Sequence, residues 1–452
     1  MVQVSLTHGP LPLVLQAGTC VVLVLAVGVR SRRWWSVWGP GAVLSGGLLA
    51  LWAYLLITSE GVAGEPAPPM LWIWLGLTGV AALWLVAGWQ TDWWRRGCAL
   101  LAVPLSALCA AETVNTWVGY VPTVGAAWSD LVSEAMPDQA DGAAVRAMQQ
   151  AGRLPPKGAV VVATINTSNP TFKHRDELVY LPPAWFATTP PPHLPTLMMI
   201  GGEFNTPTDW LLAGDAIDTV DRFAAAHAGN APVLVFVDSG GAFNIDTECV
   251  NGPRGNAADH LTKDVVPYMT SHFGVSPDPA DWGVVGFSAG GTCALDLTVM
   301  HPDLFHTFAD IAGDLGPNSG DKSQTIDRLY GGSLNAWESF DPSLVMSRHG
   351  RYNGVSGMFI VSGARFDDRN QLVGFNESEH AIATTLCDIS RRNDISCAVT
   401  AHPGKHDWPF AGGVFATTLP WVAGRVHTPG VAPIALPATS TPTGPTRPHS
   451  GH

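Results

Sequence analysis

The sequence predicts a protein of two unlike parts, a four-helix transmembrane region followed by an α/β domain on a mainly parallel sheet. Two observations predict this. Long apolar runs and most of the 18 Trp lie before residue 120 of the 452-residue chain, whereas Asp, His and Pro become frequent afterwards. In the second part, short β-branched runs alternate with helical patterns, which is typical of a sheet covered by helices on both faces.

Four apolar stretches approach or reach the ~20 residues that a helix needs to cross a bilayer. A water-soluble bundle needs polar faces at a 3.6-residue period, and these stretches have none. Met1–Pro10 has no Lys or Arg, so the alternative of a signal peptide followed by buried core helices lacks a basic n-region. The predicted spans are Leu11–Val29, Gly41–Thr58, Leu71–Trp89 and Gly97–Val118.

The arginines of the connecting loops predict the orientation of these helices. Loops that carry Lys and Arg stay on the cytoplasmic side. The first and third loops carry arginines, whereas the second loop, Ser59–Met70, has only acidic charges. We therefore expect a multi-pass membrane protein whose second part faces the periplasm or cell wall, where disulfides can form. The loop arginines are Arg30, Arg32, Arg33, Arg95 and Arg96.

The chain after residue 120 divides into three segments by composition. Residues 121–156 are mixed and moderately helical, which predicts a connector. Residues 157–425 have the pattern of a doubly wound sheet with an antiparallel start. Residues 426–452 are rich in Pro, Thr and Gly, which predicts a disordered tail. The expected strands are Ala159–Ile165, Glu177–Leu181, Thr196–Ile200, Val233–Val237, Trp282–Gly286, Phe305–Ile311, Gly357–Val361 and Ser396–Ala401, and the expected helices are Thr208–Ala228, Asn256–His272, Gly290–His301 and Ser378–Arg392.

Charge and ligand spacing exclude some classes of partner. The net charge of −13 comes mainly from the second part, and no basic patch is present, which argues against nucleic acid as a partner. The His and Cys residues show no metal-ligand spacing, so the sequence predicts neither a metal site nor a cofactor.

The strongest local signal is Gly286-Phe287-Ser288-Ala289-Gly290-Gly291, a G-x-S-x-G pattern. It follows an apolar strand pattern and precedes a helical one, which is the context of a nucleophile elbow. Its glycines permit a sharp, strained turn that lifts the Ser288 hydroxyl above the sheet. The sequence therefore predicts an α/β-hydrolase fold with Ser288 as its nucleophile.

In this fold an acid and then a histidine follow the serine in chain order, each after a later strand. The strand at 357–361 leads into Asp367 and Asp368, and we favour Asp367 as the acid, with Asp368 as the alternative. Asp314, after the preceding strand, is a further candidate. After the last strand, His406 is our choice of general base over His402, which lies closer to the strand end.

An oxyanion hole needs two backbone N–H groups, one of them directly after the nucleophile. Ala289 supplies that position. The loop Gly201-Gly202-Glu203 after the third strand supplies the second, which we assign to Glu203. Whether the Glu203 side chain points at substrate or caps the next helix stays open.

With these residues placed, residues 157–425 resemble the putative-esterase (esterase D) family, which includes the mycobacterial antigen 85 mycolyltransferases. The resemblance implies a serine esterase or acyltransferase, with Ser288 as nucleophile and His406 as base. The acid does not align, so Asp367 depends on chain order. The matching stretches are Arg175–Pro183, Gly201-Gly202, Gly286–Gly291, His301–Phe305 and Gly404–Trp408.

The preferred function is hydrolysis of a carboxylic ester through an acyl-serine intermediate, with transfer of the acyl group to an alcohol as the alternative. The two reactions use the same residues and differ in whether an acceptor alcohol outcompetes water. A hydrolase-fold protein used only for binding or as a scaffold is the rival from another class. A membrane anchor ahead of the domain is similar to that of uncharacterised actinobacterial membrane esterases, which implies a cell-envelope lipid, glycolipid or sugar ester as substrate.

The four cysteines of the second part permit two disulfides in an oxidising compartment. Cys387 and Cys397 flank a short helix-to-strand connection, close enough to pair. Cys293 lies one turn into the helix after Ser288, and the loop that carries Cys249 passes over the same edge of the sheet. We therefore predict the pairs Cys387–Cys397 and Cys249–Cys293.

Overall fold

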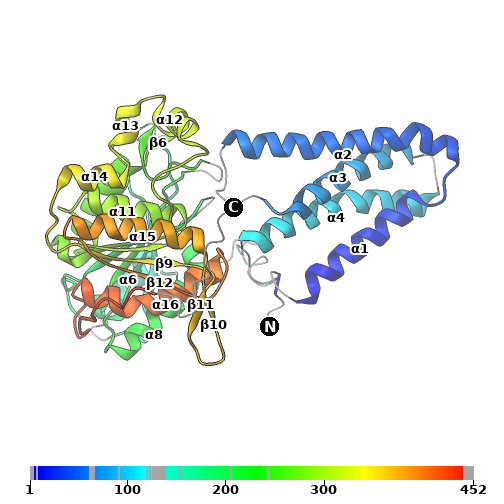
Figure 1. Ribbon diagram of the computed structural model, residues 1–452. Coiled ribbons are helices and arrows are strands. Elements are labelled where there is room, and N and C mark those ends of the chain that lie inside the picture. The colour runs from blue at the N-terminus through cyan, green and yellow to red at the C-terminus, as the bar shows by residue number, and fades with distance from the viewer. Residues whose placement is uncertain are drawn as a thin grey trace. The chain divides into compact units, whose positions relative to one another are not determined.

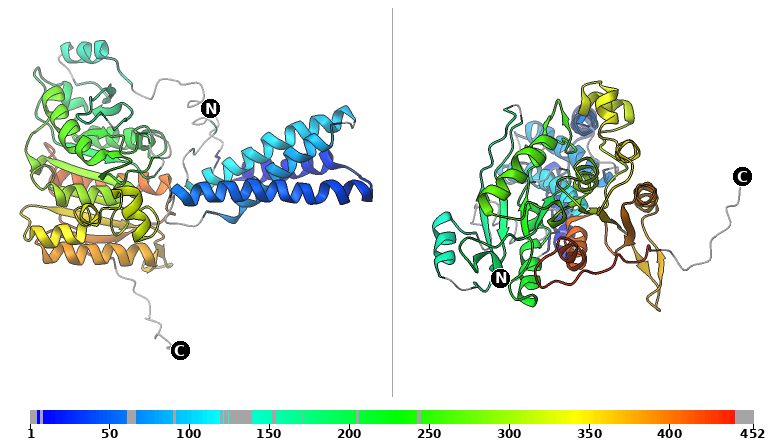
Figure 2. Two further views of the ribbon diagram at one scale, coloured as in Figure 1. Left: turned by 90° about the horizontal axis from the view of Figure 1, so that it is seen from above. Right: turned by 90° about the vertical axis from the view of Figure 1, so that its left-hand side faces the viewer.

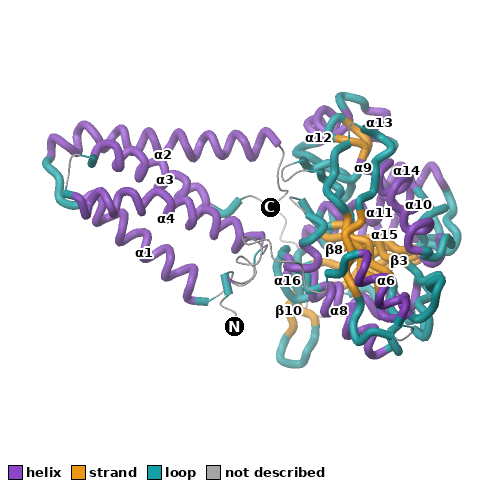
Figure 3. Tube along the Cα trace, turned by 180° about the vertical axis from the view of Figure 1, so that it is seen from behind, coloured by secondary structure: helices purple, strands orange, loops and turns teal. Residues whose placement is uncertain are grey.

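The structure is a computed structural model, and it divides into two compact units, Met1–Glu134 and Ala135–His452. Figure 3 shows the difference in content, with helices in the first unit and strands flanked by helices in the second. The described residues are 5–6, 9–60, 67–89, 92–118, 121, 124, 139–151, 154–170, 172–203, 206–241 and 245–440.

The first unit contains four helices that are long and apolar enough to cross a membrane, with mean hydropathies of 1.7 to 2.1. Side-chain contacts join them; for example, Ser45 donates to the Gly79 carbonyl, and Gln16 donates to the Glu112 carboxylate. The four predicted apolar helices are thus present, although the second begins earlier than predicted and takes in arginines assigned to the first loop. The helices are α1 (Pro10–Val27), α2 (Arg32–Glu60), α3 (Pro69–Ala87) and α4 (Trp93–Val118).

The second unit is built on an eight-stranded sheet in the order β1-β2-β4-β3-β7-β8-β9-β12. The pairs β1–β2 and β2–β4 are antiparallel and the others are parallel. The central strands are buried along their whole length, because helices cover both faces. The predicted fold, with its antiparallel start, is confirmed. The strands are β1 (Ala159–Ala163), β2 (Glu177–Leu181), β3 (Thr196–Ile200), β4 (Val233–Phe236), β7 (Trp282–Phe287), β8 (Thr307–Ile311), β9 (Ser356–Val361) and β12 (Ser396–Ala401).

Helices α11 and α15 cover one face of the sheet, and α8 and α16 cover the other (Figure 1). The predicted helix Thr208–Ala228 is broken into α7 and α8, because Asp215 takes a left-handed conformation (φ 51°) and α16 packs closely against Gly214. The helices are α6 (Gly142–Gln150), α7 (Asp209–Leu212), α8 (Ala216–Ala226), α9 (Ala257–Asp259), α10 (Val266–Tyr268), α11 (Ala289–Met300), α12 (Lys322–Tyr330), α13 (Leu334–Glu338), α14 (Pro342–His349), α15 (Glu377–Arg392) and α16 (Trp408–Arg425), with π-helical turns η2 (His260–Val265) and η3 (Met269–Phe273) and 3-10 turns η1 (Pro183–Phe186) and η4 (Pro279–Asp281).

Two short hairpins lie outside the main sheet. The hairpin of β10 (Arg365–Phe366) and β11 (Leu372–Gly374) follows β9 and projects from the domain (Figures 1 and 2). The other pairs β5 (Asn251–Gly252) with β6 (Gly255–Asn256). The first hairpin separates the end of β9 from α15, which matters for the position of the acid.

Both predicted disulfides are present. Cys249–Cys293 has a Cα–Cα distance of 5.7 Å and ties the loop after β4 to α11. Cys387–Cys397 has a Cα–Cα distance of 5.8 Å and ties α15 to β12. The first bond therefore fixes a loop at the carboxyl edge of the sheet, and the second fixes a helix to the edge strand.

The segments on either side of the predicted domain differ from expectation. Gln139, in the predicted connector, forms a parallel bridge with Val160, so the end of the connector joins the domain. The predicted disorder of residues 426–452 is wrong for residues 426–440: Thr428 is buried, and the Ser440 N–H donates to the Val399 carbonyl at 2.8 Å. This contact covers part of the open edge of β12, which otherwise exposes unpaired backbone groups. Residues 441–452 lie outside the described part of the chain.

Candidate active site

Ser288 occupies the sharp turn between β7 and α11. Its backbone has φ 58° and ψ −123°, a conformation that a non-glycine residue adopts only when its surroundings enforce it. Its N–H donates to the Ile311 carbonyl at 2.8 Å, and its carbonyl accepts from the Gly291 N–H at 2.7 Å. A Cβ on Gly286 would collide with the Gly290 carbonyl, so the turn needs glycine there. The predicted elbow is therefore present in full.

His406 lies beside Ser288, on the loop between β12 and α16. Its Nε2 is 2.9 Å from the Ser288 Oγ, which is hydrogen-bond distance. The loop is held on one side by Asp407, whose carboxylate accepts from the Phe410 N–H and caps α16. The Phe287 ring packs against the His406 ring at 4.9 Å between centroids. The structure thus brings His406, rather than His402, to the serine.

The carboxylate that contacts His406 is that of Glu379, in the first turn of α15. Its Oε1 lies 3.2 Å from the His406 Nδ1. The structure contradicts the placement of Asp367, whose exposed carboxylate accepts from the Arg369 and Gln371 N–H groups inside the β10–β11 hairpin.

The two alternative acids are also elsewhere. Asp368 is exposed on the same hairpin, and the Asp314 carboxylate accepts from the Asn318 amide. Asp367 was the wrong prediction because the β10–β11 hairpin carries the residues that follow β9 away from the edge of the sheet. The chain returns only at Asn376, the residue that caps α15. A helix-start pattern, Asn376 with Glu379 three residues later, marks the beginning of α15 in the sequence, but it does not identify Glu379 as the acid.

Glu379 is held by hydrogen bonds on both oxygens. Its Oε2 accepts from the Ser362 N–H at 2.6 Å, and its Oε1 accepts from the Ser362 hydroxyl and the Asn376 amide, each at 2.9 Å. Burial alone would raise the pKa of Glu379, but the hydrogen bonds from His406 and Ser362 outweigh it and lower the pKa below its ordinary value. The carboxylate therefore stays charged, as a group that orients a histidine must.

Both predicted oxyanion positions line one pocket beside the serine. Glu203 and Ala289 border this pocket, and a Cβ on Gly202 would lie 3.2 Å from the Ser288 Cβ. The loop after β3 therefore passes directly against the nucleophile. Ala289 is the first residue of α11, where helix N–H groups without helical partners point outward. This is the arrangement that an oxyanion hole requires.

The same pocket is lined by acidic side chains. Burial raises the pKa of Asp246 to about 6, and burial together with the neighbouring Asp246, Asp314 and Glu203 raises the pKa of Glu248 well above its ordinary value. Glu248 is buried, and its Oε2 has no hydrogen-bond partner among the described residues. The pocket thus offers a protonated carboxyl as a hydrogen-bond donor beside carboxylate acceptors, which suits a ligand with hydroxyl groups.

One further acid lies directly behind the elbow. Asp310 on β8 pairs with Gly286 in the sheet and is buried. Its Oδ1 accepts from the Gly313 N–H at 2.8 Å, yet burial raises its pKa to about 7. Asp310 therefore supports the turn from below, where its carboxylate lies against Gly291 and Gly313.

The chain is similar to known proteins along most of its length. A family model described as putative esterase matches residues 168–420. An uncharacterized protein of Corynebacterium glutamicum is 28% identical over 424 residues, covering 90% of this chain and 93% of that protein. The MPT51 antigen of Mycobacterium leprae is 28% identical over 137 residues, covering 28% of this chain and 42% of the antigen.

Solved structures with a similar chain trace include a ferulic acid esterase and an S-formylglutathione hydrolase from Agrobacterium tumefaciens. The first has a TM-score of 0.45 and 18% identity, covering 60% of this chain and 99% of that chain. The second has a TM-score of 0.46 and 16% identity, covering 60% and 97%. The family match spans more than half of the chain and includes every residue that meets at Ser288. The chain therefore belongs to the putative-esterase family and is an enzyme that acts on esters.

Proposed function

We propose that this chain is a membrane-anchored, extracytoplasmic serine esterase that cleaves a carboxylic ester through an acyl-Ser288 intermediate. The observation that carries the proposal is the continuous contact from the Ser288 hydroxyl through His406 to the Glu379 carboxylate. Each distance is within the range for proton transfer or orientation of the imidazole. An inactive scaffold would not need a strained turn, a positioned base and a partly buried charged acid at one place.

In the first half of the reaction, the His406 Nε2 takes the Ser288 proton while the Oγ attacks the ester carbonyl. The Ala289 and Glu203 N–H groups receive the charge that develops on the carbonyl oxygen. The bond to the leaving alcohol then breaks, and the His406 proton passes to that alcohol. Glu379 stabilises the charged imidazole and keeps its Nδ1–H in place throughout.

In the second half, His406 takes a proton from water as the water oxygen attacks the acyl-serine. The carboxylic acid leaves, and Ser288 recovers its proton. An acceptor alcohol in place of water gives acyl transfer instead of hydrolysis. The carboxyl-lined pocket favours an ester or acceptor with a polyhydroxylated part, such as a sugar, because each hydroxyl both donates and accepts.

The location outside the cytoplasm rests on two features. The arginines of the predicted first and third loops favour the cytoplasmic side for those loops. Two disulfides in the second unit fit an oxidising compartment. An alkaline phosphatase fusion after Trp421 should be active in cells and one after Arg33 inactive, and the reverse pattern would place the domain inside.

The chemistry is tested with the purified full chain in detergent. We expect a fluorophosphonate probe to label Ser288 and p-nitrophenyl esters of short acids to be hydrolysed with a burst of p-nitrophenol. Adding a sugar should divert acyl groups into a sugar ester if the acceptor alcohol competes with water. Absence of both labelling and turnover in folded protein would leave only the binding role.

A further inference from the structure

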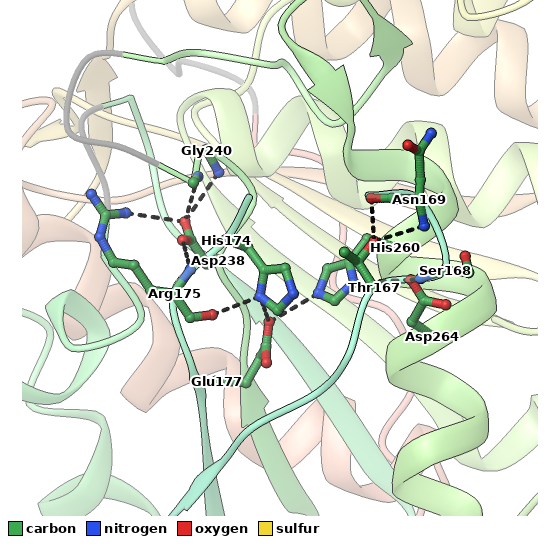
Figure 4. Close-up of polar contacts among 11 residues, drawn as sticks. Thr167, Ser168, Asn169, His174, Arg175, Glu177, Asp238, Gly240, His260 and Asp264 are labelled. Atoms are coloured by element: carbon green, nitrogen blue, oxygen red, sulfur yellow. Dashed lines mark hydrogen bonds and ion pairs between the residues drawn. The ribbon is translucent and has the colours of Figure 1, made fainter. Parts of the chain in front are cut away.

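His174, Glu177 and His260 form a second cluster of chemically active side chains (Figure 4). His174 precedes β2, Glu177 is the first residue of β2, and His260 begins the π-helical turn η2. Glu177 and His260 are fully buried, and the His174 side chain is 9% exposed. The esterase reaction uses none of these residues, so their burial together needs another explanation.

The three side chains present their ligand atoms to one another. The Glu177 Oε1 lies 3.0 Å from the His174 Nδ1 and 2.9 Å from the His260 Nε2. One ligand atom from each residue lies within 4.8 Å of the other two. The second oxygen of Glu177 is buried and has no hydrogen-bond partner among the described residues. A buried carboxylate rarely leaves an oxygen unsatisfied, which points to a missing positive partner.

His260 has an outer contact of the kind that orients metal ligands, whereas the contact of His174 competes for the nitrogen that faces Glu177. The His260 Nδ1 is 3.1 Å from the Asp264 carboxylate, so an Nδ1–H donated there leaves the Nε2 lone pair facing Glu177. The His174 Nδ1 is 2.7 Å from the Arg175 carbonyl. Binding an ion at this nitrogen therefore displaces the proton that His174 shares with the carbonyl and with Glu177.

The charges around the cluster do not balance without a cation. Glu177, Asp264 and Asp238 contribute three carboxylates. Arg175 contributes one guanidinium, which pairs with Asp238 at 3.2 Å. With neutral histidines the group has two negative charges in excess, which equals the charge of one divalent ion.

We propose that His174, Glu177 and His260 bind one divalent transition-metal ion, with Zn²⁺ as the best match. Two imidazoles and one carboxylate form a common zinc donor set, and Zn²⁺ accepts three protein ligands with little demand on geometry. The residues are 83 positions apart along the chain between Glu177 and His260, so local ligand spacing in the sequence does not show the site.

The site has a positioning role for the pocket beside Ser288. Arg175, next to His174, donates from its backbone N–H to the Asp238 carboxylate at 2.6 Å, and that carboxylate also accepts from the Gly241 N–H at 2.9 Å. Asp238 directly precedes Ser239 and Gly240, which line the pocket. A bound ion would therefore fix the segment before β2 and, through Arg175 and Asp238, the start of the pocket loop.

The test uses the full chain, without an added histidine tag, stripped by a chelator and titrated with Co²⁺ as a visible probe and then with Zn²⁺. We expect one Co²⁺ per chain with the absorption of a low-coordinate site, its displacement by one equivalent of Zn²⁺, and a rise of several degrees in Tm. Glu177→Gln and His260→Gln should weaken this binding at least tenfold. His227→Gln, a histidine of the α8 end whose Nδ1 meets the Phe223 carbonyl, is the matched control and should bind as the parent does.

The readouts are metal content, absorption and Tm, so the result does not depend on ester turnover. If the buried variants fail to fold, His174→Gln, the least buried of the three, replaces them. A parent protein that shows no saturable Co²⁺ band and no Zn²⁺-dependent Tm shift overturns the proposal. Equal binding by the parent and the cluster variants also overturns it.

Discussion

Two glutamates of this domain, Glu177 fully buried and Glu379 partly buried, each meet a histidine, and the remaining contacts distinguish what the two pairs do. Both oxygens of Glu379 accept hydrogen bonds, and the far nitrogen of His406 faces the Ser288 hydroxyl. Glu177 has one oxygen shared by two histidines and one without a described partner, and the far nitrogen of His260 faces another carboxylate. A glutamate–histidine contact alone therefore does not identify a catalytic site. The chemistry depends on the group that contacts the other ring nitrogen of the histidine.

The largest effect we expect is from removing the nucleophile. Ser288→Ala should lower kcat for p-nitrophenyl esters by at least about 10³-fold and abolish fluorophosphonate labelling, because the acyl-enzyme cannot form. Alanine takes the same backbone path with similar strain, so Tm should change little. Turnover retained within tenfold, with correct folding shown by circular dichroism, would remove Ser288 from the mechanism.

Exchanging the acid gives the next largest effect and separates Glu379 from Asp367. Glu379→Gln should lower kcat by about 10²- to 10⁴-fold with a small change in KM, since an amide no longer stabilises the charged imidazole. Asp367→Asn is the matched control, because Asp367 is exposed and contacts only its own hairpin. Kinetics of the two variants side by side decide the assignment, and an equal loss in both would contradict it.

The contrast between these two acids also shows how far the sequence predicts the site. Ser288 and His406 follow from turn chemistry and chain order, which depend on local residues and on the fold class. Glu379 does not, because β10–β11 inserts a hairpin between the end of β9 and the acid, and the length of that excursion has no local signature. His174, Glu177 and His260 meet only through pairing of β2 in the sheet and packing of the helix that carries His260, both long-range events.

The same limit explains the errors in the fold. The eight strands follow from β-branched runs, and both disulfides follow from positions around one sheet edge. The path of residues 426–440 does not, because its composition is that of a tail while its order comes from the open edge of β12. The break between α7 and α8 likewise depends on the approach of α16 to Gly214, which a helical pattern cannot reveal.

The two disulfides should differ in their effect on stability. Removal of Cys249–Cys293, which spans 44 residues, should cost about 4 kcal/mol, and removal of Cys387–Cys397, which spans 10, about 3 kcal/mol, by loop-closure entropy. Paired Cys→Ser variants compared by urea unfolding measure this order. Only the first pair lines the pocket, so only its loss should also raise KM. A larger cost for the short loop would show that packing rather than chain entropy dominates.

The depressed pKa of Glu379 predicts a pH-dependent stability. A carboxyl whose folded pKa lies below its unfolded pKa of about 4.5 stabilises the fold fully above pH 4.5, and loses that contribution as the pH falls through the folded value. Glu379→Gln should therefore lower the free energy of unfolding by about 1 to 3 kcal/mol at pH 7. The difference between variant and parent should shrink below pH 4.5. A difference that stays constant down to pH 3 would mean that Gln disturbs packing and that charge is not the cause.

Asp310 should change the free energy of unfolding with pH in the opposite direction to Glu379, and its effect should be the smallest. Its folded pKa of about 7 lies above its unfolded pKa of 3.8, so burying this group costs nothing below pH 3.8, and the cost grows as the pH rises towards 7. Asp310→Asn keeps an oxygen for the Gly313 N–H and removes the charge. The free energy of unfolding of the variant, relative to that of the parent, should be about 1 to 2 kcal/mol larger at pH 8 than at pH 4. This is less than the free energy that corresponds to the full pKa shift, because local relaxation hydrates part of the charge. Urea unfolding at both pH values measures the gain. A gain that is equal at the two pH values would mean that Asp310 is not protonated in the fold, and then the carboxylate behind the nucleophile turn must have a compensating partner.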